Sequence, residues 1–477
     1  MDTTSIRVRF APSPTGFMHL GNVRAALINY LFAHQKNGTF ILRIEDTDIQ
    51  RMIDPLGVRI MEDLNWLYLA YDEGPIIGGP YEPYYQSQRT HLYKHYLNTC
   101  IERALVYRCF CSIEELEKKR QRQLALKQPP RYDRCCLRFT SEEISQKLSS
   151  HVPFIWRFKL DHAKQVTFYD LARKTMHFEL KHFSDVPVTR EDGSFTFLFA
   201  NFIDDVEMKI SHVFRGEDHL SNTAVQVAMY EAFNIQVPTF WHLPIITNAE
   251  GKKLSKRDFG FSLTDLKNEG YLPEAICNYL ILMGGAFQKE IMTLHELTHA
   301  FNFDAITSTS QIKYDVEKLK WVNHQWIMHY NTNALLELCR PYLTCAYPTA
   351  QSLSDTQLAT LISYIQPEIV TLRESVSALA FYFTEPTPEP TLLAEHHIAS
   401  YQPFLRTLLP EIRPLLAQPE QAVKHIQAAC KAQGASIREV FTLIRIALTG
   451  KPQGLGIKEL LTLLSPDESY KRLTKPL

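Results

Sequence analysis

The N-terminal segment constrains the fold more than any other part of the chain. Apolar Ile6, Val8 and Phe10 alternate with arginines, which is the period-2 pattern of a β-strand. Apolar residues then recur with helical spacing over 22–35, and residues 40–44 are typical of a second strand. A strand, a helix and a strand in so short a stretch predict a parallel βαβ unit, because parallel strands need a crossover connection.

A second α/β stretch follows far along the chain. Residues 210–214 and 242–247 are typical of strands, and residues 222–233 between them have helical spacing. The two α/β stretches can form one sheet, with the intervening region inserted between them. Residues 329–383 and 404–465 indicate helices. We therefore expect an α/β domain with an insertion, followed by an all-α C-terminal region.

Length and composition exclude several classes of protein. With 477 residues and 45% hydrophobic residues, the chain can form about three domains and is not globally disordered. It has 51 Lys and Arg against 52 Asp and Glu, so bulk positive charge does not drive nucleic-acid binding, whereas local basic surfaces stay possible. A polar N-terminus, short apolar runs and nine cysteines predict a cytoplasmic protein with reduced thiols, no signal peptide and no membrane span.

The turn after the first strand is typical of a phosphate site. Residues 9–22 read RFAPSPTGFMHLGN, a strand that leads through a proline-rich turn to the start of a helix. A helix N-terminus offers free N–H groups and the positive end of the helix dipole to a phosphate. His19 can donate a hydrogen bond to a phosphate oxygen, and Gly21 lets a ligand ring approach the backbone. Taken alone, the segment fits a surface turn before a core helix better.

A second segment carries the complementary charge. Residues 252–257 read KKLSKR, with four cations in six positions and no acid. A lysine is a mobile point charge that suits a polyphosphate. A solvated basic loop is the ordinary interpretation of this segment by itself. Together with the HLGN turn, however, it favours a nucleotide site.

The two segments resemble the HIGH and KMSKS signatures of class I aminoacyl-tRNA synthetases, in the form that glutamyl-tRNA synthetases carry. The APSPTG turn with the HLG that follows it and the KLSKR run are similar to that family, and further matches run from end to end of the chain. These are RIEDTD at 43–48, DEGP at 72–75, FRGEDH at 214–219, GYLPEA at 270–275 and ALTG at 447–450.

The resemblance implies a two-step reaction that uses ATP with Mg²⁺. Glutamate and ATP form glutamyl adenylate and pyrophosphate, and the glutamyl group then passes to the 3′ end of tRNA-Glu with release of AMP. In such a reaction the protein contributes mainly positioning and charge stabilisation. The implied ATP-binding residues are His19, Gly21 and Lys256. The full implied catalytic set is His19, Gly21, Asn22, Lys253, Ser255, Lys256 and Arg257.

The resemblance also implies an amino-acid pocket, with cations for the carboxylate of glutamate and an anion for its ammonium. The implied residues are Arg9, Ala11, Ser13, Glu45, Phe197, Asn201 and Arg215. Phe197 departs from the family, which usually has tyrosine there. One polar contact is therefore missing, and we expect weaker glutamate binding unless Thr196 or water replaces the hydroxyl.

A cysteine cluster in the insertion predicts one structural Zn²⁺, with free buried thiols as the alternative. Cys109 and Cys111 are separated by a helical spacer from a second group, and close cysteine pairs are typical zinc ligands. The position at which relatives have a histidine holds Arg138, which cannot bind a metal. The expected third ligand is Cys136. Either Tyr132 or Cys135 completes the site, and two adjacent cysteines can both bind only with a distorted backbone.

By resemblance the chain has a class I Rossmann catalytic domain that is split by an acceptor-binding insertion. The expected parts are the catalytic domain at 1–95 and 196–262, the insertion at 96–195, a stem-contact region at 263–328 and two helical anticodon-binding subdomains at 329–390 and 391–477. The resemblance implies a monomer that binds glutamate and tRNA-Glu. Because members of the family differ in whether they also charge tRNA-Gln, tRNA-Gln is a second candidate substrate.

Three alternatives compete with this interpretation. Glutaminyl-tRNA synthetase shares the catalytic signatures, but its anticodon region is a β-barrel, and the C-terminal residues here favour helices. The truncated glutamyl-Q relative lacks an anticodon domain, so this chain is too long. A non-catalytic paralogue that binds tRNA or nucleotide usually loses signature residues, whereas His19, Gly21, Lys253, Ser255 and Lys256 are all present.

Overall fold

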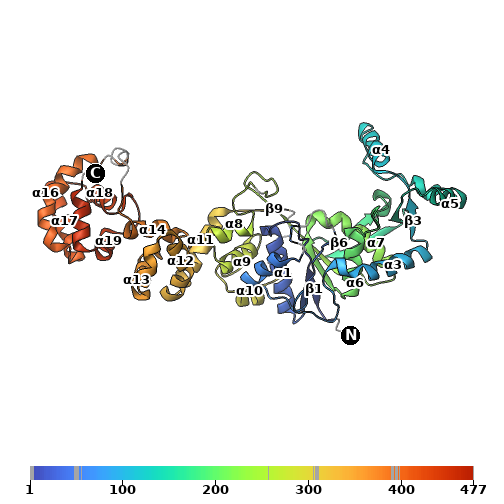
Figure 1. Ribbon diagram of the computed structural model, residues 1–477, viewed down its shortest axis with the longest axis horizontal. Helices are drawn as coiled ribbons and strands as arrows, with labels where there is room; N and C mark the ends of the chain where they lie inside the picture. The colour runs from blue at the N-terminus through green and yellow to red at the C-terminus, as the bar shows by residue number, and fades with distance from the viewer. Residues whose placement is uncertain are drawn as a thin grey trace. The chain divides into compact units, whose positions relative to one another are not determined.

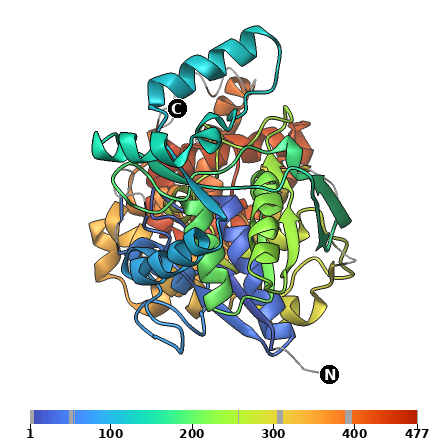
Figure 2. The same cartoon turned by 90° about the vertical axis from the view of Figure 1, so that its right-hand side faces the viewer.

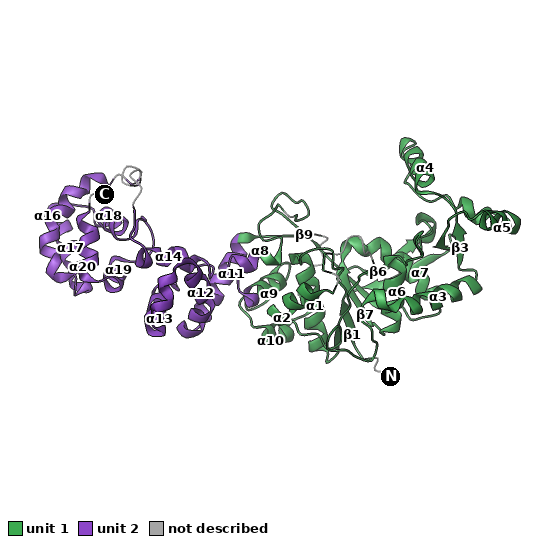
Figure 3. Cartoon of the chain, viewed as in Figure 1, with its two compact units in different colours: residues 1–265, 276–316 green, residues 266–275, 317–477 purple. Residues whose placement is uncertain are grey.

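The computed structural model describes residues 5–47, 53–54, 56–255, 257–303, 306, 311–387, 392, 396 and 398–475. The chain forms two compact units, which Figure 3 colours separately. Unit 1 comprises residues 1–265 and 276–316, and unit 2 comprises residues 266–275 and 317–477. The chain crosses between the units three times, within α8 (Leu263–Asn268), within α9 (Pro273–Leu282) and at the start of α11 (Val316–His329).

The predicted N-terminal βαβ unit is confirmed (Figure 1). Strand β1 (Arg7–Phe10) runs parallel to β2 (Thr39–Leu42), and α1 (Leu20–Gln35) connects them. All four residues of β1 are buried, including both arginines. The alternation of apolar and charged residues thus marks two buried faces, one apolar and one ion-paired, instead of a buried face and a solvated one.

The strands of the second α/β stretch belong to a four-stranded sheet in the order β6–β5–β8–β7, in which β5 and β6 come from the region predicted as the insertion. Strands β7 (His212–Gly216) and β8 (Thr239–Leu243) are parallel and joined by α7 (Leu220–Ala232), whereas β5 (Gln165–Asp170) and β6 (Lys174–Glu179) are antiparallel. The two α/β stretches meet where Ser211 N–H donates to the Arg7 carbonyl at 3.0 Å. The two stretches are therefore in contact, but the single sheet suggested by the sequence is not formed, because their strands belong to separate sheets.

The region between the two stretches includes α3 (Thr90–Glu102), α4 (Ile113–Ala125) and α5 (Ser141–Ser149), with β3 (Val106–Cys109) antiparallel to β4 (Ile155–Phe158). Helices α4 and α5 begin with capping boxes at Ser112 and Thr140 and contain no buried residue. Figures 1 and 2 show α4 standing apart from the sheets of unit 1. This helix therefore presents charged side chains to solvent on most of its surface.

The other elements of unit 1 surround the sheets. They are α2 (Val58–Trp66), α6 (Phe197–Glu207), α10 (Leu294–Ala300), β9 (Ile245–Thr247) and β10 (Gln311–Lys313), of which β9 and β10 pair in parallel. None of the described helices is long and apolar enough to cross a membrane.

Unit 2 consists of helices in the part of the chain that the structure describes. The spacing of apolar residues explains why these segments are helical. In α12, for example, the buried residues share one face at helical spacing, and they are Leu335, Leu336, Cys339 and Leu343. The helices are α11 (Val316–His329), α12 (Thr332–Ala346), α13 (Asp355–Ile365), α14 (Glu374–Phe383), α16 (Gln402–Ile412), α17 (Pro419–Gln433), α18 (Ile437–Thr449), α19 (Ile457–Leu463) and α20 (Pro466–Thr474).

Candidate active site

His19 forms the N-cap of α1. Its Nδ1 accepts hydrogen bonds from the backbone N–H groups of Gly21 at 3.1 Å and Asn22 at 3.3 Å, and the Asn22 side chain accepts from the His19 N–H at 3.3 Å. Because Nδ1 is an acceptor in this arrangement, a neutral ring carries its proton on Nε2. The cap thus leaves Nε2–H available to donate to a ligand oxygen.

The proline-rich turn lies beside residues 261–263, which follow the lysine-rich run. The Leu20 N–H donates to the Phe261 carbonyl at 3.1 Å, and the Leu263 N–H donates to the Met18 carbonyl at 2.9 Å. The His19 and Phe261 rings are stacked, with their centroids 5.1 Å apart. Two segments that are distant in sequence are therefore joined at the N-terminus of α1.

The cations of the lysine-rich run that the structure describes, Lys252, Lys253 and Arg257, are exposed. Lys253 Nζ lies 3.3 Å from an oxygen of Asp218, and exposed Arg257 follows it in the loop. Lys256, the expected ATP-binding lysine, lies outside the described residues. Burial and the nearby Lys253 charge lower the pKa of His19, against the opposing effect of Asp218. His19 is consequently neutral at physiological pH, as the acceptor role of its Nδ1 requires.

The remaining polar group of this loop is Ser255. Its backbone N–H and hydroxyl both donate to Asp258 Oδ2, at 2.8 and 2.9 Å, and Asn248 donates to the other oxygen of Asp258 at 3.1 Å. Asp258 therefore holds the two ends of the lysine-rich loop together.

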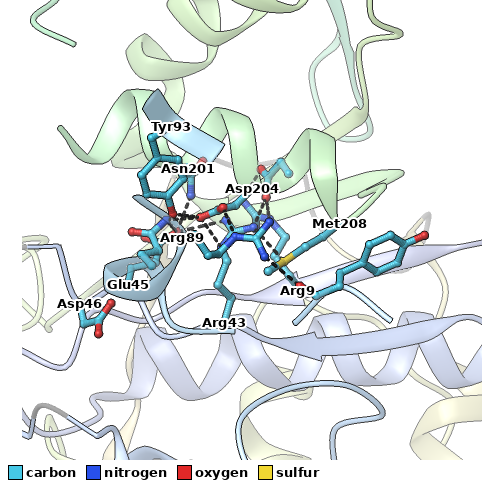
Figure 4. Close-up of polar contacts among 12 residues, drawn as sticks. Arg9, Arg43, Glu45, Asp46, Arg89, Tyr93, Asn201, Asp204 and Met208 are labelled. Atoms are coloured by element: carbon cyan, nitrogen blue, oxygen red, sulfur yellow. Dashed lines mark hydrogen bonds and ion pairs between the residues drawn. The ribbon is translucent and has the colours of Figure 1, made fainter. Parts of the chain in front are cut away.

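A cluster of buried, ion-paired side chains includes Arg9, Arg43 and Glu45 (Figure 4). Arg9 Nε and Arg43 Nη1 both donate to Asp205 Oδ1, at 3.0 and 2.8 Å, and Arg43 Nη2 donates to Glu45 at 3.1 Å. Burial tends to raise the pKa of Asp205, but the two guanidiniums hold it below its usual range. Arg9 is thus a buried, paired cation and not an outward strand charge.

Glu45 begins a chain of hydrogen bonds that ends at Arg215. Asn201 Nδ2 donates to Glu45 at 2.6 Å, Gln226 Nε2 donates to Asn201 Oδ1 at 2.8 Å, and Arg215 Nη2 donates to Gln226 Oε1 at 2.6 Å. All four side chains are buried. Three residues of the predicted amino-acid pocket, Glu45, Asn201 and Arg215, are therefore linked, with Gln226 as the connection.

Arg215 forms no ion pair with any carboxylate in the part of the chain that the structure describes. Burial, together with the neighbouring Arg9 charge, lowers the pKa of its guanidinium to about 10. Its Nε and Nη1 are buried and have no hydrogen-bond partner among the described residues. A buried cation with unused N–H groups is costly, so this geometry suits an anionic ligand.

The other predicted pocket residues lie around these groups. Ala11 is half-buried and Ser13 is exposed in the turn that follows β1. Phe197 begins α6, and its ring centroid lies 5.6 Å from that of His219. Burial and the Arg215 charge lower the pKa of His219 to about 4, so its ring is neutral beside Phe197.

Sequence reasoning missed several residues of this site. Asp205 and the Asp204 beside it bind Arg9, Arg43 and Arg89 in the core of unit 1. Their sequence signal is an acidic pair within the otherwise apolar helix α6, whose residues 199–206 are all buried. Two adjacent buried carboxylates demand buried cations, and that demand was open to inference before the structure.

The predicted cysteine cluster is assembled in the structure. The Sγ atoms of Cys109, Cys111 and Cys136 all lie within 4.8 Å of one another. Cys135 Sγ is 3.3 Å from that of Cys111 and 3.8 Å from that of Cys136, and Lys119 Nζ donates to it at 2.9 Å. The two adjacent cysteines follow Arg134, whose φ is 57°.

Comparisons with known proteins agree over the whole chain. A family model described as tRNA synthetases class I (E and Q), catalytic domain, matches residues 5–321, and one described as anticodon binding domain matches residues 334–477. The chain is 36% identical to a glutamate–tRNA ligase of Carboxydothermus hydrogenoformans over 480 residues, covering 98% of this chain and 99% of the relative. It is 34% identical to that of Bacillus subtilis over 479 residues, with coverage of 98% and 99%.

Solved structures agree with the family models. The glutamate–tRNA synthetase of Elizabethkingia anophelis matches with a TM-score of 0.85 and 31% identity, covering 98% of this chain and 99% of that one. The glutamate–tRNA ligase of Elizabethkingia meningosepticum, solved in complex with its amino acid, matches with a TM-score of 0.84 and 30% identity, covering 98% of each chain. The chain therefore belongs to the class I tRNA synthetase family of the glutamate and glutamine enzymes.

Proposed function

We propose that this chain attaches L-glutamate to the 3′ end of tRNA-Glu through a glutamyl adenylate, with ATP and Mg²⁺ as co-substrate and with release of AMP and pyrophosphate. The observation that carries the proposal is the junction of the His19 turn with residues 261–263 through the Leu20 and Leu263 backbone bonds, which holds the lysine-rich run with Lys253 near His19. It brings a helix N-terminus, a neutral histidine donor and mobile cations to one place. These are the groups that stabilise charge on a polyphosphate as it reacts.

In this proposal the roles follow from the contacts. His19 Nε2–H donates to the α-phosphate while Nδ1 holds the start of α1, and Gly21 leaves room for the nucleotide base. Lys253 is exposed and paired with exposed Asp218, so its exchange from that partner to a phosphate costs little. Lys256 and Arg257 neutralise the departing pyrophosphate.

The amino-acid pocket recognises glutamate through its charges. Arg215 offers its unpaired N–H groups to the side-chain carboxylate, and Glu45 accepts the ammonium. Burial raises the pKa of Glu45 in the free protein, against the opposing effect of Arg43, so a substrate cation stabilises the ionised carboxylate there. Arg9, Ala11, Ser13, Phe197 and Asn201 complete the pocket.

We further propose that Cys109, Cys111, Cys136 and Tyr132 hold one structural Zn²⁺. Tetrahedral Zn–S bonds of ~2.3 Å place sulfur atoms ~3.8 Å apart, and the Cys111 and Cys136 Sγ atoms are already 3.5 Å apart. The Tyr132 side chain interacts with Cys109 and Cys136. Cys135 contacts Cys111 and Cys136, but it is not in the group of three sulfur atoms that lie within 4.8 Å of one another, and it also accepts from Lys119. These contacts favour Tyr132 over Cys135 as the fourth ligand.

Metal analysis of protein purified without added zinc tests this site. We expect about one zinc per chain, a loss of zinc in Cys109→Ser, and its retention in Cys135→Ser. Zinc far below one per chain in the unaltered protein would refute the site. Loss of zinc in Cys135→Ser with retention in Tyr132→Phe would assign the fourth ligand to Cys135.

The predicted domain boundaries stay part of the proposal. We assign acceptor-strand binding to the insertion at 96–195, stem contacts to 263–328, and anticodon binding to the helical subdomains at 329–390 and 391–477. The protein is proposed to act as a cytoplasmic monomer. The helical unit 2 supports an anticodon domain of the glutamyl type over the β-barrel of glutaminyl enzymes.

Charging assays test the function directly. Purified protein is incubated with labelled glutamate, ATP and Mg²⁺ and with transcripts of tRNA-Glu or tRNA-Gln. Charging of tRNA-Glu alone identifies a discriminating enzyme, and charging of both identifies a non-discriminating one. If neither is charged while tRNA is still bound, the catalytic proposal fails and the non-catalytic paralogue takes its place.

A further inference from the structure

Arg215 also begins a second series of buried, hydrogen-bonded side chains. Its Nη2 donates to Thr223 Oγ1 at 2.6 Å, and Thr223 Oγ1 lies 2.7 Å from Nε2 of His242. His242 Nδ1 lies 2.7 Å from Oδ2 of Asp170. All four side chains are buried, and the last three belong to none of the sequence signatures. This hydrogen-bonded series connects β7, α7, β8 and the end of β5.

Asp170, at the far end of this hydrogen-bonded series, determines where the protons lie along it. Asp170 Oδ1 accepts from the backbone N–H groups of Ala172 and Arg173 at 2.9 and 2.8 Å, and Oδ2 accepts from the His242 N–H at 3.0 Å. Although burial opposes it, these bonds and the His242 ring lower the pKa of Asp170. Asp170 is thus an ionised acceptor that is fixed in position by the backbone.

An ionised Asp170 determines the tautomer of His242. Its Nδ1 must carry the proton that Asp170 accepts, and burial lowers the pKa of the ring, so the ring is neutral and Nε2 is an acceptor. The Thr223 hydroxyl then donates to Nε2, which is closer than its other acceptor, the His219 carbonyl at 3.2 Å. This leaves a lone pair of Thr223 Oγ1 for Arg215.

Together, Thr223 and Gln226 use both N–H bonds of Arg215 Nη2. The Nε and Nη1 groups are left without a partner among the described residues. We propose that Thr223 and His242 are positioning residues that hold Arg215 with these free N–H groups directed to the side-chain carboxylate of glutamate. This inference rests on the proposed function, because it assumes that glutamate binds at Arg215.

A purely structural role is the competing interpretation, since four elements meet at these residues. The two roles differ in what a substitution changes. A structural defect weakens every substrate interaction or lowers stability, whereas a misplaced Arg215 weakens glutamate binding alone. The ratio of the effects on glutamate and ATP therefore separates them.

Thr223→Val removes the hydroxyl at nearly constant volume, and Thr223→Ser is the matched control that keeps it. Charging of tRNA-Glu by the full chain is measured with glutamate varied at saturating ATP, and then with ATP varied. We expect Thr223→Val to raise the glutamate KM about ten- to hundredfold, because a buried N–H of a cation loses its acceptor. The ATP KM should change less than about twofold, and Thr223→Ser should stay close to the unaltered protein.

His242→Asn is a second variant that keeps the test decisive if Thr223→Val does not fold. Asparagine retains a donor toward Asp170 and loses the acceptor for Thr223, so the glutamate KM should rise in the same direction. Equal glutamate KM values for Thr223→Val and Thr223→Ser, or a parallel rise in the ATP KM, would overturn the inference. Failure of the unaltered protein to charge glutamate would instead refute the proposed function, so the two failures are distinguishable.

Discussion

Replacing Gly21 by alanine tests the geometry of the His19 turn with a single methyl group. A Cβ at this position would lie 3.0 Å from Cε1 and 3.1 Å from Nδ1 of the His19 ring. Carbon atoms in contact prefer ~3.5–4.0 Å, so the ring must move by about 0.5 Å. The same substitution at Gly16, in the same turn, meets nothing within 4 Å and is the matched control.

The effects on stability and catalysis should separate. Alanine is favoured over glycine within a helix by about 1 kcal/mol, and a weakened N-cap costs about 1 kcal/mol, so the free energy of unfolding should hardly change. A misplacement of ~1 Å can lower a rate ~100-fold, so half that shift of the Nε2 donor predicts a loss of about tenfold or more. That loss corresponds to about 1.4 kcal/mol in the transition-state free energy.

Glutamate-dependent exchange of pyrophosphate into ATP, measured with tRNA present, reports the adenylate step. We expect kcat/KM for ATP to fall about tenfold or more in Gly21→Ala and to stay near the original value in Gly16→Ala. Urea unfolding of both variants checks that the folds are equally stable. Equal exchange rates for the two variants would refute the contact between the turn and the nucleotide.

Four further results are expected. Phe197→Tyr should lower the glutamate KM about two- to tenfold by restoring one hydrogen bond, and an unchanged KM would contradict the pocket assignment. His19→Asn should keep the N-cap, and hence the stability, but lower the exchange rate ~10²–10³-fold because the Nε2 donor is lost; a rate near the original would exclude that role. Burial and Lys253 lower the pKa of His19, so neutral His19 persists below pH 6.5, and Lys253→Gln should move the acid limit of exchange to higher pH. Asp205→Asn removes the anion between two buried arginines, so urea unfolding should show a loss of ~3–5 kcal/mol, and a change below ~1 kcal/mol would contradict the cluster.

The sequence predicts the elements of the fold because short-range periodicity determines them. The βαβ unit is parallel as expected, and α1 extends only slightly beyond the predicted residues 22–35. The helical C-terminal region is likewise confirmed in the described residues. The burial of Arg7 and Arg9 was not predictable from β1 itself, because it depends on Glu73 and Asp205 from distant segments.

The residues of the candidate site likewise fall into those that the sequence predicts and those that it does not. Residues within signatures, such as His19 and Glu45, could be named before the structure. Thr223, His242 and Asp170 could not, because each lies in an ordinary apolar element and gains its meaning only from the partner that packing places beside it. When polar residues that are distant in sequence pair in a core, a single sequence shows no periodic pattern that predicts the pairing.

The central claim is best tested by the products of a single reaction mixture. Purified protein, labelled glutamate, ATP, Mg²⁺ and a tRNA-Glu transcript should yield glutamyl-tRNA with one AMP for each glutamyl group. Replacement of glutamate by glutamine should abolish both products, since Arg215 lacks an internal counter-ion among the described residues and requires a carboxylate. Equal charging with glutamine, or binding of tRNA without release of AMP, would contradict the account.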